Sequence, residues 1–164
     1  MRNVLGLLAL AALGAAPIGA QAATGMAAMQ YYVGTWTCTG GMTGQAPAKA
    51  TLTNTLDSGV MRQWIVVPPQ GKMKMQYTLS VAVTYDAKNG RYVQTGLDNQ
   101  AGWWVSYAKP FTGNTEQWAD HMNNTGKLGR SEVMRSDQNS YVYTGYDTMA
   151  ATKPNFKTAC RRSM

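Results

Sequence analysis

The segment MKMQYTLSVAVTYD, residues 73–86, alternates apolar and polar positions from end to end. Successive side chains of a β-strand point to opposite faces, so this pattern predicts a strand with one buried and one solvated face. We expect the odd-numbered side chains from Tyr77 to Val83 to be buried, with Thr78, Ser80 and Thr84 facing water. An unbroken strand of this length would span more than about 40 Å, so we expect it to bend or twist strongly.

Turn signals divide the rest of the chain into similar short strands. The sequence DAKNG, residues 86–90, ends in Asn-Gly, a pair that favours the positive φ of a hairpin turn. About ten strands spaced in this way are typical of a β-sandwich or a β-barrel. A short helix is expected over 25–32, and the polar segment 119–129, which contains the only histidine, is expected to be a loop. The other predicted strands cover 35–40, 49–56, 60–67, 91–97, 103–107, 115–119, 130–135, 141–147 and 156–161.

Two short motifs carry a resemblance to a known superfamily. Gly34-Thr35-Trp36 opens the first predicted strand, and Arg161 and Arg162 lie in the last one. This arrangement resembles the calycins (lipocalins, fatty-acid-binding proteins and nitrobindin-like barrels), in which a basic residue of the last strand packs across the tryptophan of a Gly-x-Trp.

The middle of the chain resembles a bacterial group of secreted lipocalin-like domains of unknown function. The matching residues are Tyr85-Asp86, Gly90-Arg91-Tyr92-Val93 and Asp98. The resemblance covers most of residues 23–164 and implies an all-β, antiparallel, up-and-down barrel of about ten strands with a short N-terminal helix. An unrelated β-sandwich is the alternative fold.

Residues 1–22 have the pattern of a secretory signal peptide. Arg2 precedes an apolar run over 4–13, and Ala20-Gln21-Ala22 forms an A-x-A cleavage site. The run is shorter than the ~20 residues of a membrane-spanning helix, and no later stretch is apolar enough to span. We therefore expect a periplasmic or secreted protein whose single lipocalin-like domain occupies residues 23–164.

The two cysteines, Cys38 and Cys160, are expected to form a disulfide in an oxidising compartment; two free buried thiols are the alternative. An up-and-down barrel closes by pairing its first and last strands. If these strands run antiparallel with Cys38 opposite Cys160, the register places Arg162 opposite Trp36 on the same face, and Arg161 on the other face.

Composition disfavours several classes of function. The formal net charge is +7, but only 14% of residues are charged and the basic residues are scattered, so nucleic-acid binding is not expected. A weak attraction to anionic envelope surfaces is compatible with the charge, although a solvated surface explains it as well. The sequence contains none of the usual phosphate-loop, serine-hydrolase or HExxH motifs, so we expect no enzyme and no cofactor.

We predict that the barrel interior binds a small apolar or amphipathic ligand. The candidate pocket residues are Met75, Tyr77, Leu79, Val81 and Trp103. A filled barrel that binds an envelope protein through its loops is the second hypothesis.

A haem or copper carrier is the weakest hypothesis. It would use His121 and Met122 or the pair Met73 and Met75, because imidazole and thioethers suit Cu(I). Nitrobindin-like proteins hold haem iron with a histidine near the C-terminus, and residues 156–164 contain none.

Overall fold

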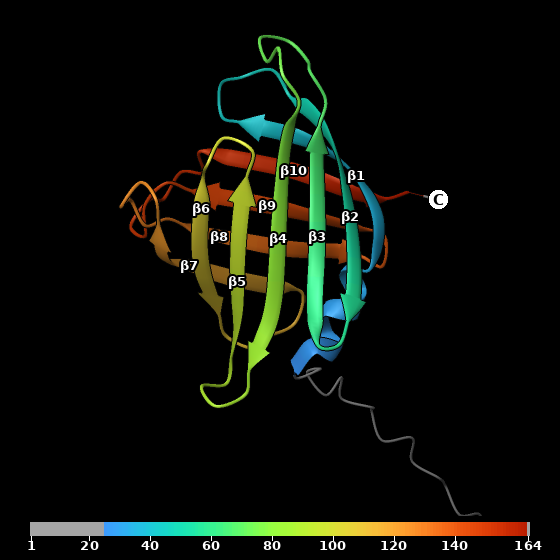
Figure 1. The fold of residues 1–164 in the computed structure, drawn as a ribbon, viewed down its shortest axis with the longest axis vertical. Helices are drawn as coiled ribbons and strands as arrows, with labels where there is room; N and C mark the ends of the chain where they lie inside the picture. The colour runs from blue at the N-terminus through green and yellow to red at the C-terminus, as the bar shows by residue number, and fades with distance from the viewer. Residues whose placement is uncertain (1–24, 164) are drawn as a thin grey trace, which may run out of the picture.

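The computed structural model describes residues 25–163, which form a closed antiparallel barrel with one short 3-10 helix (Figure 1). The predicted signal peptide, residues 1–22, lies outside the described residues. The elements are η1 (Gly25–Tyr32), β1 (Gly34–Met42), β2 (Ala48–Asp57), β3 (Val60–Val67), β4 (Tyr77–Asp86), β5 (Arg91–Asp98), β6 (Trp103–Ala108), β7 (Thr115–Asn123), β8 (Arg130–Asp137), β9 (Ser140–Tyr146) and β10 (Phe156–Arg162).

The sheet topology is the predicted up-and-down order. Each strand pairs with its neighbours in the chain, and β1 pairs with β10 to close the barrel. In Figure 1, β2 to β5 run roughly vertically at the front, and β8 to β10 cross behind them at a steep angle. The expected barrel and the expected N-terminal helix over 25–32 are therefore confirmed.

The seam between β1 and β10 has the predicted register. Cys38 lies opposite Cys160 and forms a disulfide with it, and Trp36 lies opposite Arg162. The guanidinium carbon of Arg162 lies 4.4 Å from the centroid of the Trp36 ring, which is a cation–π contact. Arg161 pairs with Thr37, and both side chains are exposed on the outer face.

The predicted strand over 73–86 is wrong in its first four residues. β4 begins at Tyr77, and 73–76 belong to a loop in which Gln70 and Met73 form an isolated bridge. The partner strand β3 ends at Val67 before Pro68-Pro69, and proline has no N–H to continue a ladder. Without that partner, alternation alone does not extend the sheet, and Met73 and Met75 share no strand face.

The predicted loop over 119–129 is also wrong in part. β7 continues to Asn123, so His121 lies on a strand. Its position is that of a β-bulge, because Ser106 pairs with Asp120 whereas Val105 pairs with Met122. The connection between β7 and β8 is restricted to residues 124–129, where Asn123 accepts hydrogen bonds from the backbone and hydroxyl of Thr125.

Within residues 25–163 no helix has the length and apolar character needed to cross a membrane.

Candidate functional site

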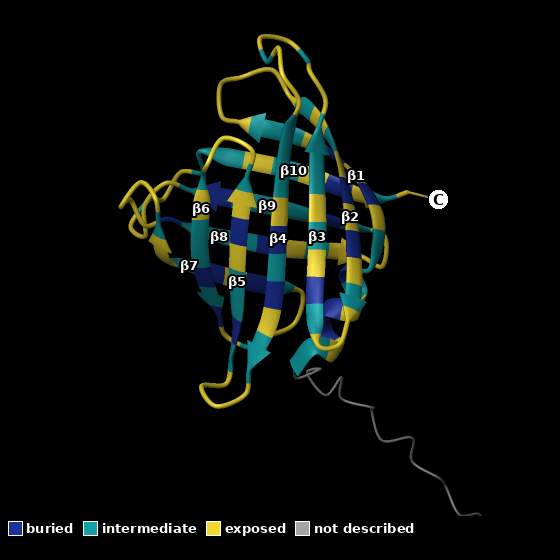
Figure 2. Ribbon diagram, in the orientation of Figure 1, coloured by how far each residue is buried: buried dark blue, intermediate teal, exposed yellow. Residues whose placement is uncertain are grey.

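The interior of the barrel divides into two halves that are packed differently. The half next to η1 is called the closed half, and the opposite half is called the mouth half. Most large inward side chains of the closed half are exposed by 7% or less, and these include Trp36, Met61, Val83, Tyr92, Trp118 and Tyr141. Figure 2 shows the alternation of buried and exposed bands along the strands that produces this core.

Helix η1 fills the end of the closed half. Met29 and Tyr32 are buried in the core, and the backbone carbonyl of Tyr32 accepts hydrogen bonds from Trp36 Nε1 and Asn54 Nδ2, each at 2.8 Å. Arg162 donates to the carbonyls of Tyr31 and Val33 at 2.6 and 2.5 Å. The helix is therefore bound to β1, β2 and β10 by polar contacts as well as by apolar packing.

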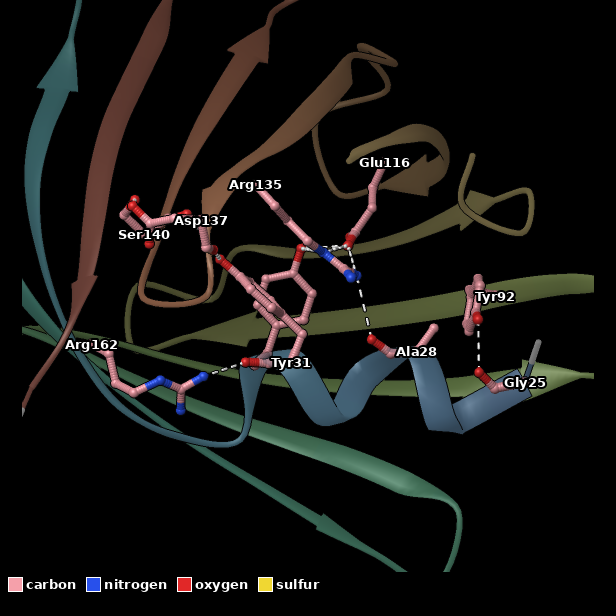
Figure 3. Close-up of polar contacts among 10 residues, drawn as sticks. Gly25, Ala28, Tyr31, Tyr92, Glu116, Arg135, Asp137, Ser140 and Arg162 are labelled. Carbon is pink, nitrogen blue, oxygen red and sulfur yellow. Dashed lines mark hydrogen bonds and ion pairs between the residues drawn. The ribbon is translucent and has the colours of Figure 1, made fainter. Parts of the chain in front are cut away.

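A buried ion pair joins η1 to the far wall of the closed half (Figure 3). Arg135 Nη2 lies 2.5 Å from Glu116 Oε1, and the same oxygen accepts a hydrogen bond from the Tyr32 hydroxyl. Arg135 also donates to the Ala28 carbonyl at 3.3 Å. Burial raises the pKa of Glu116, and the hydrogen bonds from Tyr32 and Arg135 oppose that rise.

The mouth half has small inward residues where the closed half has large ones. These residues are Gly40, Ala50, Gly96, Ser106, Ser131, Gly145 and Thr158. The larger inward side chains of this half, Ile65, Tyr77, Leu79, Trp104 and Tyr143, are only partly buried. Apart from Tyr77, these larger side chains pack against the core of the closed half, and all of them remain partly exposed at the mouth.

A cavity of about 500 Å³ opens at this mouth between the β5–β6 and β7–β8 connections. Trp104, Tyr143, Asp98 and Asp120 line it, together with residues of the two connections. The Trp104 ring lies flat over Gly96, where a Cβ would overlap the indole. A glycine at this position thus lets the indole lie against the barrel wall.

The two carboxylates of the mouth are held by neighbouring donors. Asp98 accepts hydrogen bonds from the backbone N–H of Gln100 and Gly102 at 2.8 Å each and from the Tyr77 hydroxyl at 3.0 Å. Burial by itself would raise the pKa of Asp98, but these donors outweigh it and lower the pKa. Asp120 accepts from the Ser106 hydroxyl at 2.8 Å and from the Gly129 backbone at 3.0 Å.

The sequence matches no protein-family model and no curated protein. The proposed function therefore rests on the geometry of residues 25–163.

The predicted pocket residues fall in three places. Tyr77 and Leu79 are inward in the mouth half, and Val81 is inward at mid-barrel but buried to 3% exposure. Met75 lies on the β3–β4 loop and is 76% exposed, so its predicted place on the inward strand face is wrong. Trp103 points outward at the rim and borders the cavity there.

Sequence reasoning missed Trp104, Tyr143, Asp98 and Asp120. In β6 both alternating sets contain a tryptophan, so the pattern does not say which one points inward. The bulge at His121 also shifts the inward phase of β7. The one available signal was Gly96, an inward glycine in a strand, which often marks a close approach by another group.

The described part of the chain contains no cluster of side chains that would support the metal hypothesis. No group of three or more His, Cys, Asp or Glu side chains in residues 25–163 is placed to hold an ion. His121 is exposed on the outer face, with its ring centroid 4.7 Å from that of Tyr107.

A second hollow of about 630 Å³ lies on the outer face over β5 to β8. Arg91 and Arg130 border it, and each stacks on a tyrosine, Tyr107 and Tyr146 respectively. Both guanidiniums also pair with carboxylates of their own surface, Asp86 and Glu132. This hollow lies outside the barrel and is separate from the mouth.

Proposed function

We propose that this protein is an exported, lipocalin-like carrier that binds a small amphipathic ligand in the mouth half of its barrel and performs no chemistry on it. The observation that carries the proposal is an open hollow of about 500 Å³ at the mouth, where aromatic rings of Trp103, Trp104 and Tyr143 lie beside the carboxylates Asp98 and Asp120. Concave sites that combine aromatic walls with placed polar groups are typical of ligand sites.

The lining of the mouth favours a particular kind of ligand. Trp103, Trp104 and Tyr143 offer aromatic surface for the apolar part of a ligand. Asp98 and Asp120 place negative charge at the entrance, so a hydrogen-bond donor or cationic head group is favoured there and an anionic head group is disfavoured. An amphipathic ligand with a donor-rich or cationic head fits both features.

The disulfide supports export, because such bonds persist mainly in oxidising compartments. The closed ten-stranded antiparallel barrel is compatible with the calycin architecture, in which barrels of this type enclose small ligands. N-terminal sequencing of the intact protein, purified from its own host, tests the export proposal. A mature chain beginning near Ala23 is expected, and an intact Met1 on envelope material would contradict it.

Ligand binding is tested with native mass spectrometry of protein purified from its host, in two variants matched on one strand. Ala50→Phe enlarges an inward side chain of the barrel, and Thr51→Phe enlarges an outward one. We expect a small molecule to co-purify with the native chain and with Thr51→Phe, and to be lost in Ala50→Phe. Circular dichroism checks that both variants fold. Leu79→Ala removes an inward side chain without adding bulk, and we expect it to lower retention of the co-purifying molecule.

A filled-barrel interaction module is the second candidate, favoured by the tight packing of the closed half and by the outer hollow with its two stacked arginines. This candidate predicts that no small molecule co-purifies and that Ala50→Phe has no functional effect. Under it, Arg91→Ala and Arg130→Ala would instead abolish capture of a protein partner.

A further inference from the structure

Four large apolar side chains form an exposed patch beside the mouth, here called the rim patch. Trp64 is 50% exposed, Met75 76%, Leu97 58% and Trp103 41%. Three of them lie in one row across the outer face, because Trp64 pairs with Ser80, Ser80 with Leu97, and Leu97 with Trp103. Met75 lies apart from the row, on the β3–β4 loop before the start of β4.

Most outward residues around the row are uncharged, and Arg62 of β3 is the cation that lies beside them. The outward residues between and beside the four are Thr78, Ser80, Ala82, Thr95 and Val105. Clustered exposed apolar side chains on a protein surface mark an interaction site more often than scattered ones do. The rim patch is thus an apolar surface with hydroxyl groups and no internal ion pair.

Exposed cations lie beside the rim patch, whereas the carboxylates Asp98 and Asp120 line the adjacent mouth. Arg62 precedes Trp64 on the same face, and Lys72 and Lys74 lie on the β3–β4 loop. The backbone of Lys49 exchanges two hydrogen bonds with the side chain of Gln70 on that loop. From residue 58 to residue 108 the only acidic residues are Asp86 and Asp98. Asp86 lies at the far end of β4 beside Arg91, and Asp98 turns into the mouth, where it accepts three hydrogen bonds.

We propose that the rim patch docks on the surface of an anionic lipid bilayer through the outer face of β3 to β6. Tryptophan is favoured at the membrane–water interface because its ring is apolar with one polar tip. Lysine and arginine near such a patch add attraction to anionic head groups.

A second copy of the chain is the less favourable occupant. A two-fold dimer through the rim patch would bring Arg62, Lys72 and Lys74 of one copy toward the same cations of the other. Each chain also carries a formal charge of +7, which adds to the repulsion. Charge complementarity therefore favours an anionic surface, and the proposal does not depend on which ligand occupies the mouth.

Vesicle flotation with the mature chain tests the proposal. Vesicles of phosphatidylcholine alone are compared with vesicles that also contain phosphatidylglycerol. We expect binding only to the anionic vesicles, weakened by added salt, with a blue shift of tryptophan fluorescence. Lys72→Gln combined with Lys74→Gln should weaken binding at least about tenfold, and Trp64→Thr combined with Leu97→Thr should weaken it and reduce the blue shift.

Matched controls come from the far end of the barrel. Lys88→Gln removes a cation and Met134→Thr removes a 54% exposed apolar side chain, and neither should change binding. Equal binding of all variants, binding to phosphatidylcholine alone, or no binding would overturn the proposal. Sedimentation that shows a dimer lost in Trp64→Thr would assign the rim patch to self-association instead. Ala50→Phe should still bind vesicles, which separates this proposal from the ligand proposal.

Discussion

The closed half and the mouth half of this barrel are built by the same ten strands, yet they are packed in opposite ways. β4 shows the contrast within one strand: Val83 and Val81 are 2% and 3% exposed, whereas Leu79 and Tyr77, on the same inward face, are only partly buried. Val83 and Val81 belong to the buried core, whereas Leu79 packs against the edge of that core.

Apolar–polar alternation along a strand indicates which face points inward. It does not indicate whether the interior is filled. Filling depends on the summed volume of side chains from several strands at one level of the barrel. Burial is therefore tightest in the closed half, and the proposal of ligand binding concerns the mouth half.

The largest expected effect concerns the seam that holds both halves in one barrel. Cys160→Ser removes a crosslink between residues separated by 122 positions, and the loop-entropy model assigns about 4–5 kcal/mol to a loop of that size. We expect a large loss in the free energy of unfolding, measured by urea denaturation. A loss below about 1 kcal/mol would mean that the strand pairing of β1 and β10 is sufficient without the disulfide.

Two arginines of β10 serve as controls for that experiment. Arg162→Ala removes the cation over Trp36 and should cost about 0.5–2 kcal/mol. Arg161→Ala lies on the outer face and should cost least, within about 0.5 kcal/mol. A reversed order of the two would contradict the register of the seam.

The second prediction tests the ion pair of the closed half. Arg135→Met keeps most of the side-chain volume but leaves the Glu116 carboxylate, 2% exposed, without its partner. Breaking a buried pair in this way costs about 3–5 kcal/mol. We expect a loss of that size in the free energy of unfolding at neutral pH.

The pH dependence of Arg135→Met follows from the pKa of Glu116. Burial raises this pKa in the folded state, and Arg135 no longer opposes the rise. A raised folded-state pKa gives stability below the unfolded pKa of about 4.3 that is lost as the pH rises through the folded value. The loss in the free energy of unfolding, relative to the native chain, should therefore be small in acid and reach its full size at neutral pH. Adding Glu116→Gln should remove this dependence, and a deficit independent of pH would refute it.

The third prediction compares the two halves directly on β4. Val83→Ala leaves a cavity in the closed half and should cost about 1–3 kcal/mol. Leu79→Ala removes a larger side chain, but solvent already reaches it, so it should cost no more than about 1 kcal/mol. Thermal unfolding of both variants measures the difference. Equal or reversed costs would show that the mouth half is packed as tightly as the closed half.

The smallest effect is expected at His121, which lies outside both halves. His121→Ala removes an exposed ring that stacks on Tyr107 and should change the free energy of unfolding by less than about 0.5 kcal/mol. The variant should also retain any molecule that co-purifies with the native chain. Loss of a bound metal or chromophore in this variant would support the metal-carrier hypothesis over the ligand proposal.

Most of the fold was predictable because it depends on local signals. The inward face of β4, the Asn-Gly turn before Arg91 and the pairing of Cys38 with Cys160 follow from alternation, turn chemistry and one crosslink. The errors at Met75 and His121 have a common cause. A strand ends where its neighbour ends, and a bulge shifts the phase of a strand, so both depend on a partner distant in sequence.

The sequence by itself indicated the strands, through period-two alternation, and the one possible cysteine pair. The resemblance to the calycins implied the up-and-down order, and with it the register of the seam and the contact of Arg162 with Trp36. Only the tertiary structure decided that Trp104, rather than Trp103, points inward, that Glu116 meets Arg135 and Tyr32, and that one half of the barrel is open. Such properties depend on which side chains of non-adjacent strands share one level of the barrel, and spacing along the chain does not specify that.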